Sequence, residues 1–164
     1  MSESVTPPKR ELTAILVGGL IAATFDIVQV TIFYAVKGVD WMRIPQSVAS
    51  GLLGKASYSG GMATAMLGYG LHYAMALVMA AVYVLAARRL DILVRRPWLM
   101  GTLYGLGLYV VMTYVVVPLS MAKGGHFNWP SFIDGILAHT LAVGIPIALA
   151  ARWARRTGLA TDPA

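Results

Sequence analysis

Four long apolar segments constrain this chain more than any other feature of its sequence. An α-helix needs about 20 mostly apolar residues to cross the hydrocarbon core of a bilayer. Only 12% of the chain is charged, against about 25% in an ordinary soluble domain, so its surface is too apolar to face water. The pattern predicts an all-α, polytopic membrane protein with four transmembrane helices, over about residues 12–36, 62–87, 98–121 and 131–151.

Lysine and arginine are unevenly distributed around these segments. Most lie before the first helix, between the second and third, or after the fourth: Lys9, Arg10, Arg88, Arg89, Arg95, Arg96, Arg152, Arg155 and Arg156. The positive-inside rule therefore predicts that both termini are cytoplasmic, in a bacterial cytoplasmic (inner) membrane. Tails at 1–11 and 152–164 would flank one domain at 12–151. We expect the arginine clusters to attract anionic lipids, and no nucleic acid, because the charges form no single patch.

The stretch between the first two helices is short and rich in small residues. Residues 44–61 read IPQSVASGLLGKASYSGG, which is too short to cross a membrane. Indexed as a helix over about 44–56, it carries one face of small side chains: Ser47, Ser50, Gly51 and Gly54. We predict an interfacial or re-entrant helix. Either this face packs on the bundle and the helix caps its outer mouth, or the helix is a plain amphipathic anchor.

The same stretch carries a resemblance. RIPQSVASGLLGKASYSGG is preceded by a helix with Asp26 and followed by one with Gly68-x-x-x-His72. In this it resembles the YagU-like family of small bacterial inner-membrane proteins of unknown function. The resemblance covers about residues 12–90 best and the second half only in hydropathy. It implies the four-helix topology and brings no activity or cofactor.

Each predicted helix places one polar side chain near the middle of the membrane. An ionisable group there costs roughly 2.5–3.5 kcal/mol on insertion scales, so it is a candidate functional residue. Counted at 1.5 Å per residue, four residues fall at similar depths: Asp26, His72, Tyr109 and His139. Gln29 and Thr113, one turn away, would extend this polar layer. For Asp134 we predict a different role: its carboxylate complements the helix dipole in the first turn of the fourth helix.

Three functions are compatible with this layer. The first is a structural or stress-related membrane protein in which interhelical hydrogen bonds only fix the packing. The second is a transporter, channel or transporter subunit that moves protons or solutes, as a homo-oligomer, because four helices enclose little space. The third is an intramembrane enzyme with a metal at Asp26, His72 and His139.

Several other classes of site have no counterpart in the sequence. The chain contains no cysteine, which excludes disulfides, thiolate metal sites and cysteine nucleophiles. It also has no phosphate-binding glycine loop, no Gly-x-Ser-x-Gly elbow and no His-Glu-x-x-His motif. Gly101-x-x-x-Gly105 is compatible with a close helix crossing. The sequence therefore leaves any metal, cofactor and substrate unknown.

Overall fold

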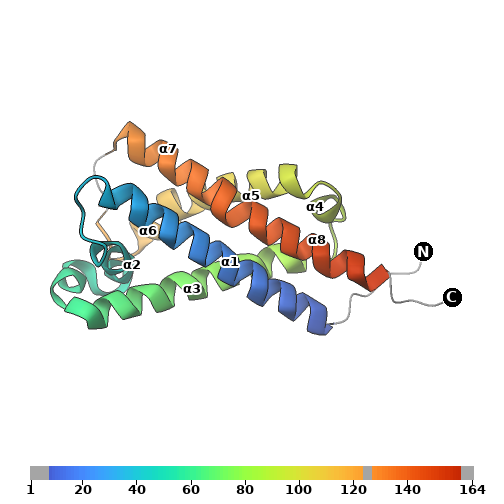
Figure 1. Cartoon of the computed structure of the whole chain (residues 1–164), viewed down its shortest axis with the longest axis horizontal. Helices are drawn as coiled ribbons and strands as arrows, with labels where there is room; N and C mark the ends of the chain where they lie inside the picture. Colours follow the sequence, from blue (N-terminus) through green and yellow to red (C-terminus); the bar gives the residue numbers. More distant parts are fainter. Residues whose placement is uncertain (1–7, 124–126, 160–164) are drawn as a thin grey trace.

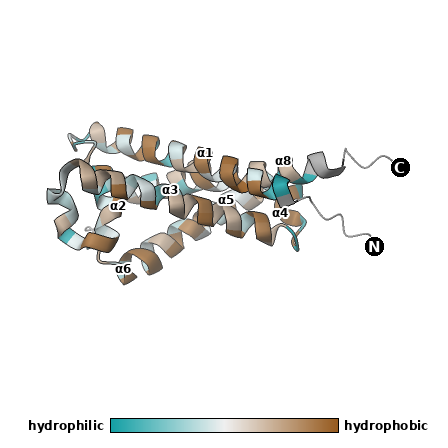
Figure 2. Cartoon of the chain, turned by 90° about the horizontal axis from the view of Figure 1, so that it is seen from below, coloured by the Kyte–Doolittle hydropathy of each residue, from teal (hydrophilic) through white to brown (hydrophobic). Residues whose placement is uncertain are grey.

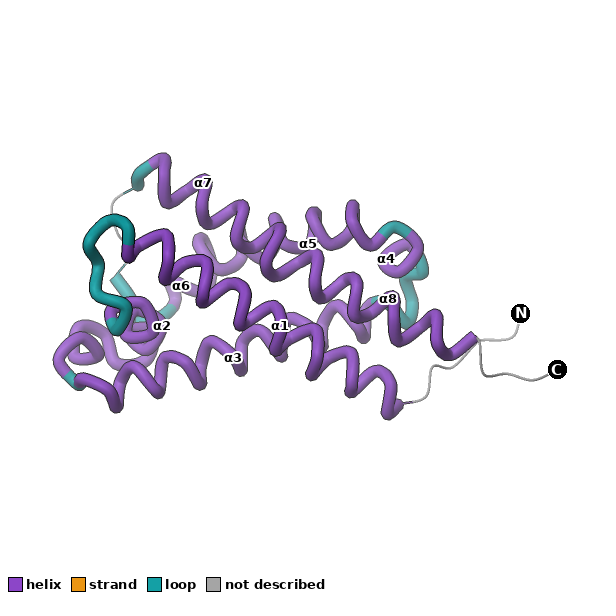
Figure 3. The backbone as a smooth tube through the Cα atoms, viewed as in Figure 1, coloured by secondary structure: helices purple, strands orange, loops and turns teal. Residues whose placement is uncertain are grey.

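A computed structural model describes residues 8–123 and 127–159. The described residues form an antiparallel bundle of helices without a β-strand (Figures 1 and 3). Four of its helical stretches are long and apolar enough to cross a membrane: Lys9–Ala35, Gly61–Ala86, Pro97–Leu119 and Trp129–Arg155. This confirms the predicted all-α fold with four candidate transmembrane helices.

The helices are divided as follows. The first two long helices are α1 (Pro8–Ala35) and α3 (Gly61–Ala86), and between them lie α2 (Arg43–Leu53) and the 3₁₀-helix η1 (Gly54–Ser59). The third long stretch comprises α5 (Pro97–Val111), the π-helix η2 (Met112–Val116) and α6 (Val117–Leu119), preceded by the short α4 (Ile92–Arg95). The fourth comprises α7 (Trp129–Leu137), the π-helix η3 (Ala138–Gly144) and α8 (Ile145–Leu159).

The two ends of the bundle differ. Helix α1 begins and α8 ends at the same end, beside α4, which we call the terminal end (Figure 1). Helix α2 and η1 lie at the opposite end, which we call the α2 end (Figure 1). The parts of the predicted tails at 1–7 and 160–164 lie outside the described residues. Residues 152–159, within the predicted C-terminal tail, continue the fourth helix.

Local sequence explains where several helices begin and turn. Pro97 occupies the first turn of α5, where its missing N–H is not needed. The side chain of Asn128 caps α7 by accepting a hydrogen bond from the N–H of Ser131 at 2.9 Å. Gly54 and Gly61 adopt φ values of 55° and 57°. Both allow the chain to reverse between α2 and α3, in a conformation that side chains disfavour.

The bundle is held together by small side chains and is covered by large ones. The buried cluster at its centre is rich in alanine and includes Ala14, Ala22, Ala80, Ile147, Ala148 and Ala151. Many leucine, valine, isoleucine, methionine and aromatic side chains are exposed instead, and brown hydrophobic residues cover the outside of the helices in Figure 2. Small side chains at the helix interfaces, with large apolar side chains on the outside, are typical of helices that associate within lipid.

Glycine brings the third and fourth stretches into backbone contact. A Cβ atom on Gly105 would lie 2.2 Å from the carbonyl oxygen of His139, and one on Gly101 would lie 2.9 Å from that of Gly144. Neither position has room for a side chain. Gly101-x-x-x-Gly105 therefore forms the close crossing with which the motif is compatible.

Candidate functional site

A carboxylate and an imidazole meet between α1 and α3. The Nε2 atom of His72 lies 3.8 Å from Oδ2 of Asp26, and their side chains are 12% and 16% exposed. The same Nε2 atom is 3.0 Å from the carbonyl oxygen of Ala23. The helices can approach this closely because Gly19 packs against α3, where a Cβ atom would lie 3.1 Å from Cα of Leu77. Thr24 and Tyr73 add a hydrogen bond of 2.9 Å beside the pair.

His72 lies near the middle of α3, and Asp26 lies about two-thirds of the way along α1. Asp26 is nine residues before the end of α1 at Ala35, and His72 is eleven residues after the start of α3 at Gly61. At 1.5 Å per residue these positions lie roughly 14 and 17 Å from the α2 end. Half of a hydrocarbon core is about 15 Å. The ionisable pair is therefore near the centre of the apolar span.

Further polar contacts follow α1 from this pair towards the α2 end. The amide of Gln29 donates a hydrogen bond to Oδ1 of Asp134 on α7. One turn farther, the hydroxyl of Tyr34 donates to Ser131 at 3.1 Å. Asp134 also interacts electrostatically with Asp26 and with Lys37. We call Asp26, His72, Gln29, Asp134, Tyr34 and Ser131 the polar line.

Asp134 therefore has a different place from the one predicted. The sequence placed it in the first turn of the fourth helix, but α7 begins at Trp129, so Asp134 lies beyond that turn. Asn128 provides the cap. Asp134 instead faces α1 and binds Gln29, a partner 105 residues away in sequence. No pattern within either helix indicates that pairing.

The other two members of the predicted layer lie at a different interface. His139 is on η3, and its Nδ1 atom is 2.9 Å from the carbonyl oxygen of Gly135. Its ring packs edge-on against Tyr109 of α5, with centroids 5.7 Å apart. A Cβ atom on Gly135 would lie 2.6 Å from the Tyr109 ring, so glycine makes room for this aromatic contact. Thr113 lies in η2 and is partly buried.

The predicted layer is thus two separate contacts, Asp26–His72 between α1 and α3 and Tyr109–His139 between α5 and η3. In the described part of the chain, no three histidine, aspartate or glutamate side chains are grouped closely enough to hold a metal ion. The donor set proposed from the sequence, Asp26, His72 and His139, is not assembled in this fold.

Towards the terminal end the polar line stops. There the interior contains the mainly apolar cluster with Ala80, Val84 and Ile147. Its two tyrosine hydroxyls, of Tyr83 and Tyr104, donate to the backbone carbonyls of Leu93 and Met79. Beyond it, Arg88 makes a forked hydrogen bond to Glu11, whose side chain is only 8% exposed. That hydrogen bond, and next the charge of Glu11, raise the pKa of the Arg88 guanidinium. The polar line therefore reaches one end of the bundle only.

Three arginines of the predicted lipid-binding clusters have acidic partners. Arg88 binds Glu11, Arg155 binds Asp91 at 2.9 Å, and Arg95 lies 3.9 Å from the other carboxylate oxygen of Asp91. Glu11 lies within α1 and is buried, although the sequence placed it in a tail. Its position follows from the ion pair, since a buried carboxylate needs a partner.

Helix α2 packs on the bundle with a face that includes Ser50 of the predicted small face but not Ser47. Its buried residues are Ile44, Pro45, Gln46, Ala49 and Ser50. Of the predicted small face, Ser50 is buried, whereas Gly51 and Gly54 lie against Ser120 and Met121. Ser47 is exposed, so its assignment to the packed face is wrong.

The reason for this orientation is a backbone contact between α2 and α3. A Cβ atom on Gly68 would lie 1.8 Å from the carbonyl oxygen of Pro45, so only glycine fits there. The amide of the buried Gln46 then donates to the carbonyl oxygen of Gly61 at 3.1 Å. Both contacts fix the rotation of α2 about its axis and turn Ser47 outwards.

Comparisons with known proteins add nothing to this geometry: no family model, no curated protein and no solved structure matches the chain. The resemblance to the YagU-like family therefore stays a prediction. The geometry alone shows that the chain has the architecture of a multi-pass membrane protein with an ionisable pair in its interior.

Proposed function

We propose that this chain is a proton-handling membrane protein, acting as a small transporter or transporter subunit. One observation carries the proposal: an Asp–His pair lies near the centre of the apolar span, and polar contacts follow α1 from it to the α2 end. In the described terminal half the interior is mainly apolar, and the hydroxyls of Tyr83 and Tyr104 donate to backbone carbonyls there. Ionisable groups at such a depth are typical of proton relays. Histidine also titrates within about pH 5–8.

The polar line is not fully satisfied by its own contacts. Among the described side chains, the buried Oε1 atom of Gln29 has no hydrogen-bond partner. A buried acceptor in that state costs roughly 1–3 kcal/mol. Interhelical packing alone does not require such a cost, whereas a functional site tolerates it.

The membrane placement belongs to this proposal. With the arginine-rich terminal end in the cytoplasm of a bacterium, the α2 end faces outwards, and Asp26–His72 takes up protons from outside the inner membrane. Release to the cytoplasm requires a rearrangement, because the apolar cluster closes the terminal half. Only 6% of the residues in the most apolar part of the third span are buried, against 22–33% in the other three spans. The third span is therefore free to contact lipid or a second copy.

The test is a proton flux into liposomes that enclose a pH-sensitive dye. An imposed pH gradient should collapse faster with the wild-type protein than with Asp26→Asn or His72→Gln. Asp40→Asn is the control, because this exposed carboxylate lies outside the polar line and accepts a bond from the nearby N–H of Met42. Equal rates for the wild type, both variants and empty liposomes, with all proteins folded, would contradict the proposal.

A structural function is the second candidate, and one observation favours it. The imidazole of His72 contacts the Ala23 carbonyl at 3.0 Å, and Thr24 binds Tyr73 at 2.9 Å, so polar groups also tie α1 to α3. Under this reading the substitutions at Asp26 and His72 change stability and leave the proton flux at the level of empty liposomes.

A further inference from the structure

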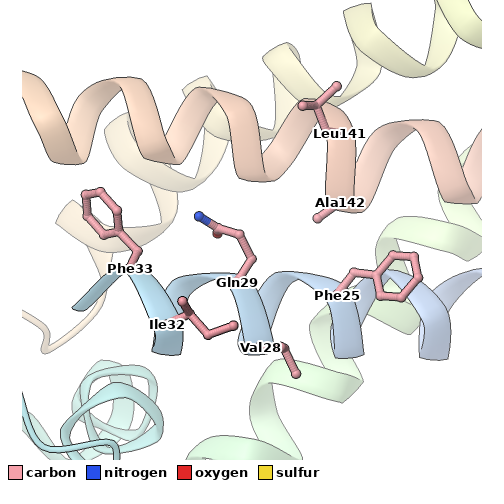
Figure 4. A pocket seen from close by; sticks show the side chains of 7 residues that line it. All are labelled: Phe25, Val28, Gln29, Ile32, Phe33, Leu141 and Ala142. Carbon is pink, nitrogen blue, oxygen red and sulfur yellow. The ribbon is translucent and has the colours of Figure 1, made fainter. Parts of the chain in front are cut away.

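An apolar groove runs along the outside of the bundle between α1 and η3. Its volume is about 600 Å³. Phe25, Val28, Ile32 and Phe33 line it from α1, opposite Leu141 and Ala142 of η3 (Figure 4). Phe25, Val28, Ile32 and Leu141 are between 50% and 59% exposed. The groove therefore opens away from the bundle, towards the lipid that surrounds a transmembrane helix.

The groove has the length of one leaflet. From Phe25 to Phe33, α1 rises about 12 Å, and Lys37 follows about one turn later. Together they cover roughly 18 Å, slightly more than the 15 Å or so of half a hydrocarbon core. The groove thus extends from near the centre of the span to the level of the headgroups at the α2 end.

A positive charge lies at the headgroup end of the groove. The Nζ atom of Lys37 is 3.5 Å from the centroid of the Phe33 ring, which is part of the lining. Lys37 is exposed. An apolar groove with one ammonium group at its polar end matches the chemistry of a phospholipid, which has an apolar chain and an anionic phosphate.

We propose that this groove binds one phospholipid from the leaflet at the α2 end. One acyl chain lies along α1 from Phe25 to Phe33, and the phosphate binds Nζ of Lys37. Gln29 is also part of the lining, so the chain covers the side chain that donates to Asp134. The bound lipid thereby covers this hydrogen bond on the side of the bundle that faces the bilayer. The proposal concerns a ligand and does not depend on proton transport.

Native mass spectrometry of the detergent-purified protein tests the acyl-chain site, with dioleoyl phosphatidylglycerol as the probe. Ile32→Trp fills the groove, and Val78→Trp is the control, since Val78 is 63% exposed on α3 and outside the groove. We expect one tightly retained lipid on the wild type and on Val78→Trp. The Kd should rise at least about tenfold in Ile32→Trp.

The headgroup site is tested in the same experiment. Lys37→Gln should weaken phosphatidylglycerol binding several-fold, whereas Lys55→Gln, at the same end of the bundle but on η1, should not. Inorganic phosphate should not displace the lipid, because it lacks the chain that fills the groove. An effect of Ile32→Trp without one of Lys37→Gln would overturn the assignment of the phosphate to Lys37.

Two further outcomes would overturn the whole proposal. One is the same number and affinity of bound lipids in the wild type, Ile32→Trp and Val78→Trp. The other is a lipid-free dimer that Ile32→Trp converts to a monomer, which would assign the groove to a second copy of the chain. Circular dichroism checks that each variant keeps its helix content. Val28→Trp fills the groove from a neighbouring position should Ile32→Trp fail to fold.

Discussion

His72 of α3 lies 3.8 Å from Asp26 of α1, while the same imidazole nitrogen contacts the carbonyl oxygen of Ala23 at 3.0 Å. The imidazole is thus shared between a carboxylate and the backbone of the neighbouring helix. Asp26 has the weaker position of the two, because its favourable side-chain contact is the ion pair and its electrostatic interaction with Asp134 is repulsive. This asymmetry distinguishes the effects of the two substitutions.

Replacing His72 should therefore cost more stability than replacing Asp26. His72→Leu leaves the Asp26 carboxylate without its partner and should lower the free energy of unfolding by roughly 1–3 kcal/mol. Asp26→Leu leaves His72 bound to Ala23 and should be milder. The double variant should recover most of the loss, since an apolar pair can replace a buried ionic one.

A double-mutant cycle on thermal or denaturant unfolding in detergent measures this coupling. If the two single losses simply add in the double variant, the groups do not interact and the pair is not a unit. A double variant that is more stable than the wild type would show that the pair costs stability, as functional sites often do.

Gly68→Ala should detach α2 from the bundle. The new Cβ atom would lie 1.8 Å from the carbonyl oxygen of Pro45, and backbone cannot rotate away as a side chain can. We expect a loss of at least 1–3 kcal/mol from overpacking, together with faster proteolysis within residues 43–59. The matched control is Gly70→Ala on the same helix, which meets no atom within 4 Å. It should raise stability by up to about 1 kcal/mol through helix propensity. Equal melting temperatures for the two variants would contradict the contact.

The sequence predicted the existence and approximate limits of the four long helices, because those depend on hydrophobic length alone. It also located the helix between the first two, at 44–56 against Arg43–Leu53 in the structure. It could not predict how each helix is rotated about its axis. The rotation of α2 is set by one contact, Pro45 on Gly68, between residues that no periodicity connects.

The candidate site illustrates the same limit. Depth along a helix can be counted, and Asp26 and His72 do meet at similar depths. The sequence does not indicate which helices are neighbours. His139 packs on Tyr109 of α5 and does not join Asp26 and His72. His139 also lies in a π-helix, η3, whose wider turn changes the direction of the side chains that follow. Gln29–Asp134 and Glu11–Arg88 were missed because each joins residues that are far apart in the sequence, 105 and 77 residues respectively.

Arg88→Ala should destabilise the terminal end more than Arg89→Ala. Arg88 binds the carboxylate of Glu11, which is buried and would lose this partner, whereas the exposed Arg89 is the adjacent residue of the same loop. Since the folded state raises the pKa of Arg88, its stabilising contribution is fully present below the ordinary pKa of arginine. It should therefore be constant across neutral pH and be lost only in strong alkali. Melting temperatures at several neutral pH values check this, and equal values for the two variants would show that the ion pair is not stabilising.

The chain contains no cysteine, so single cysteines can report which positions water reaches. Thiols react as thiolates, which form only in contact with water. Ser131→Cys, at the α2 end of the polar line, should react quickly with a membrane-impermeant thiosulfonate. Asp134→Cys, whose native side chain binds Gln29 and is not part of the groove lining, should react more slowly, and only with reagent added on the side of the α2 end. Val84→Cys, in the apolar cluster where the native residue is 4% exposed, should not react from either side. If Asp134→Cys is as inert as Val84→Cys, the polar line is dry. Asp26 and His72 then serve packing alone, since no proton could reach them from the α2 end.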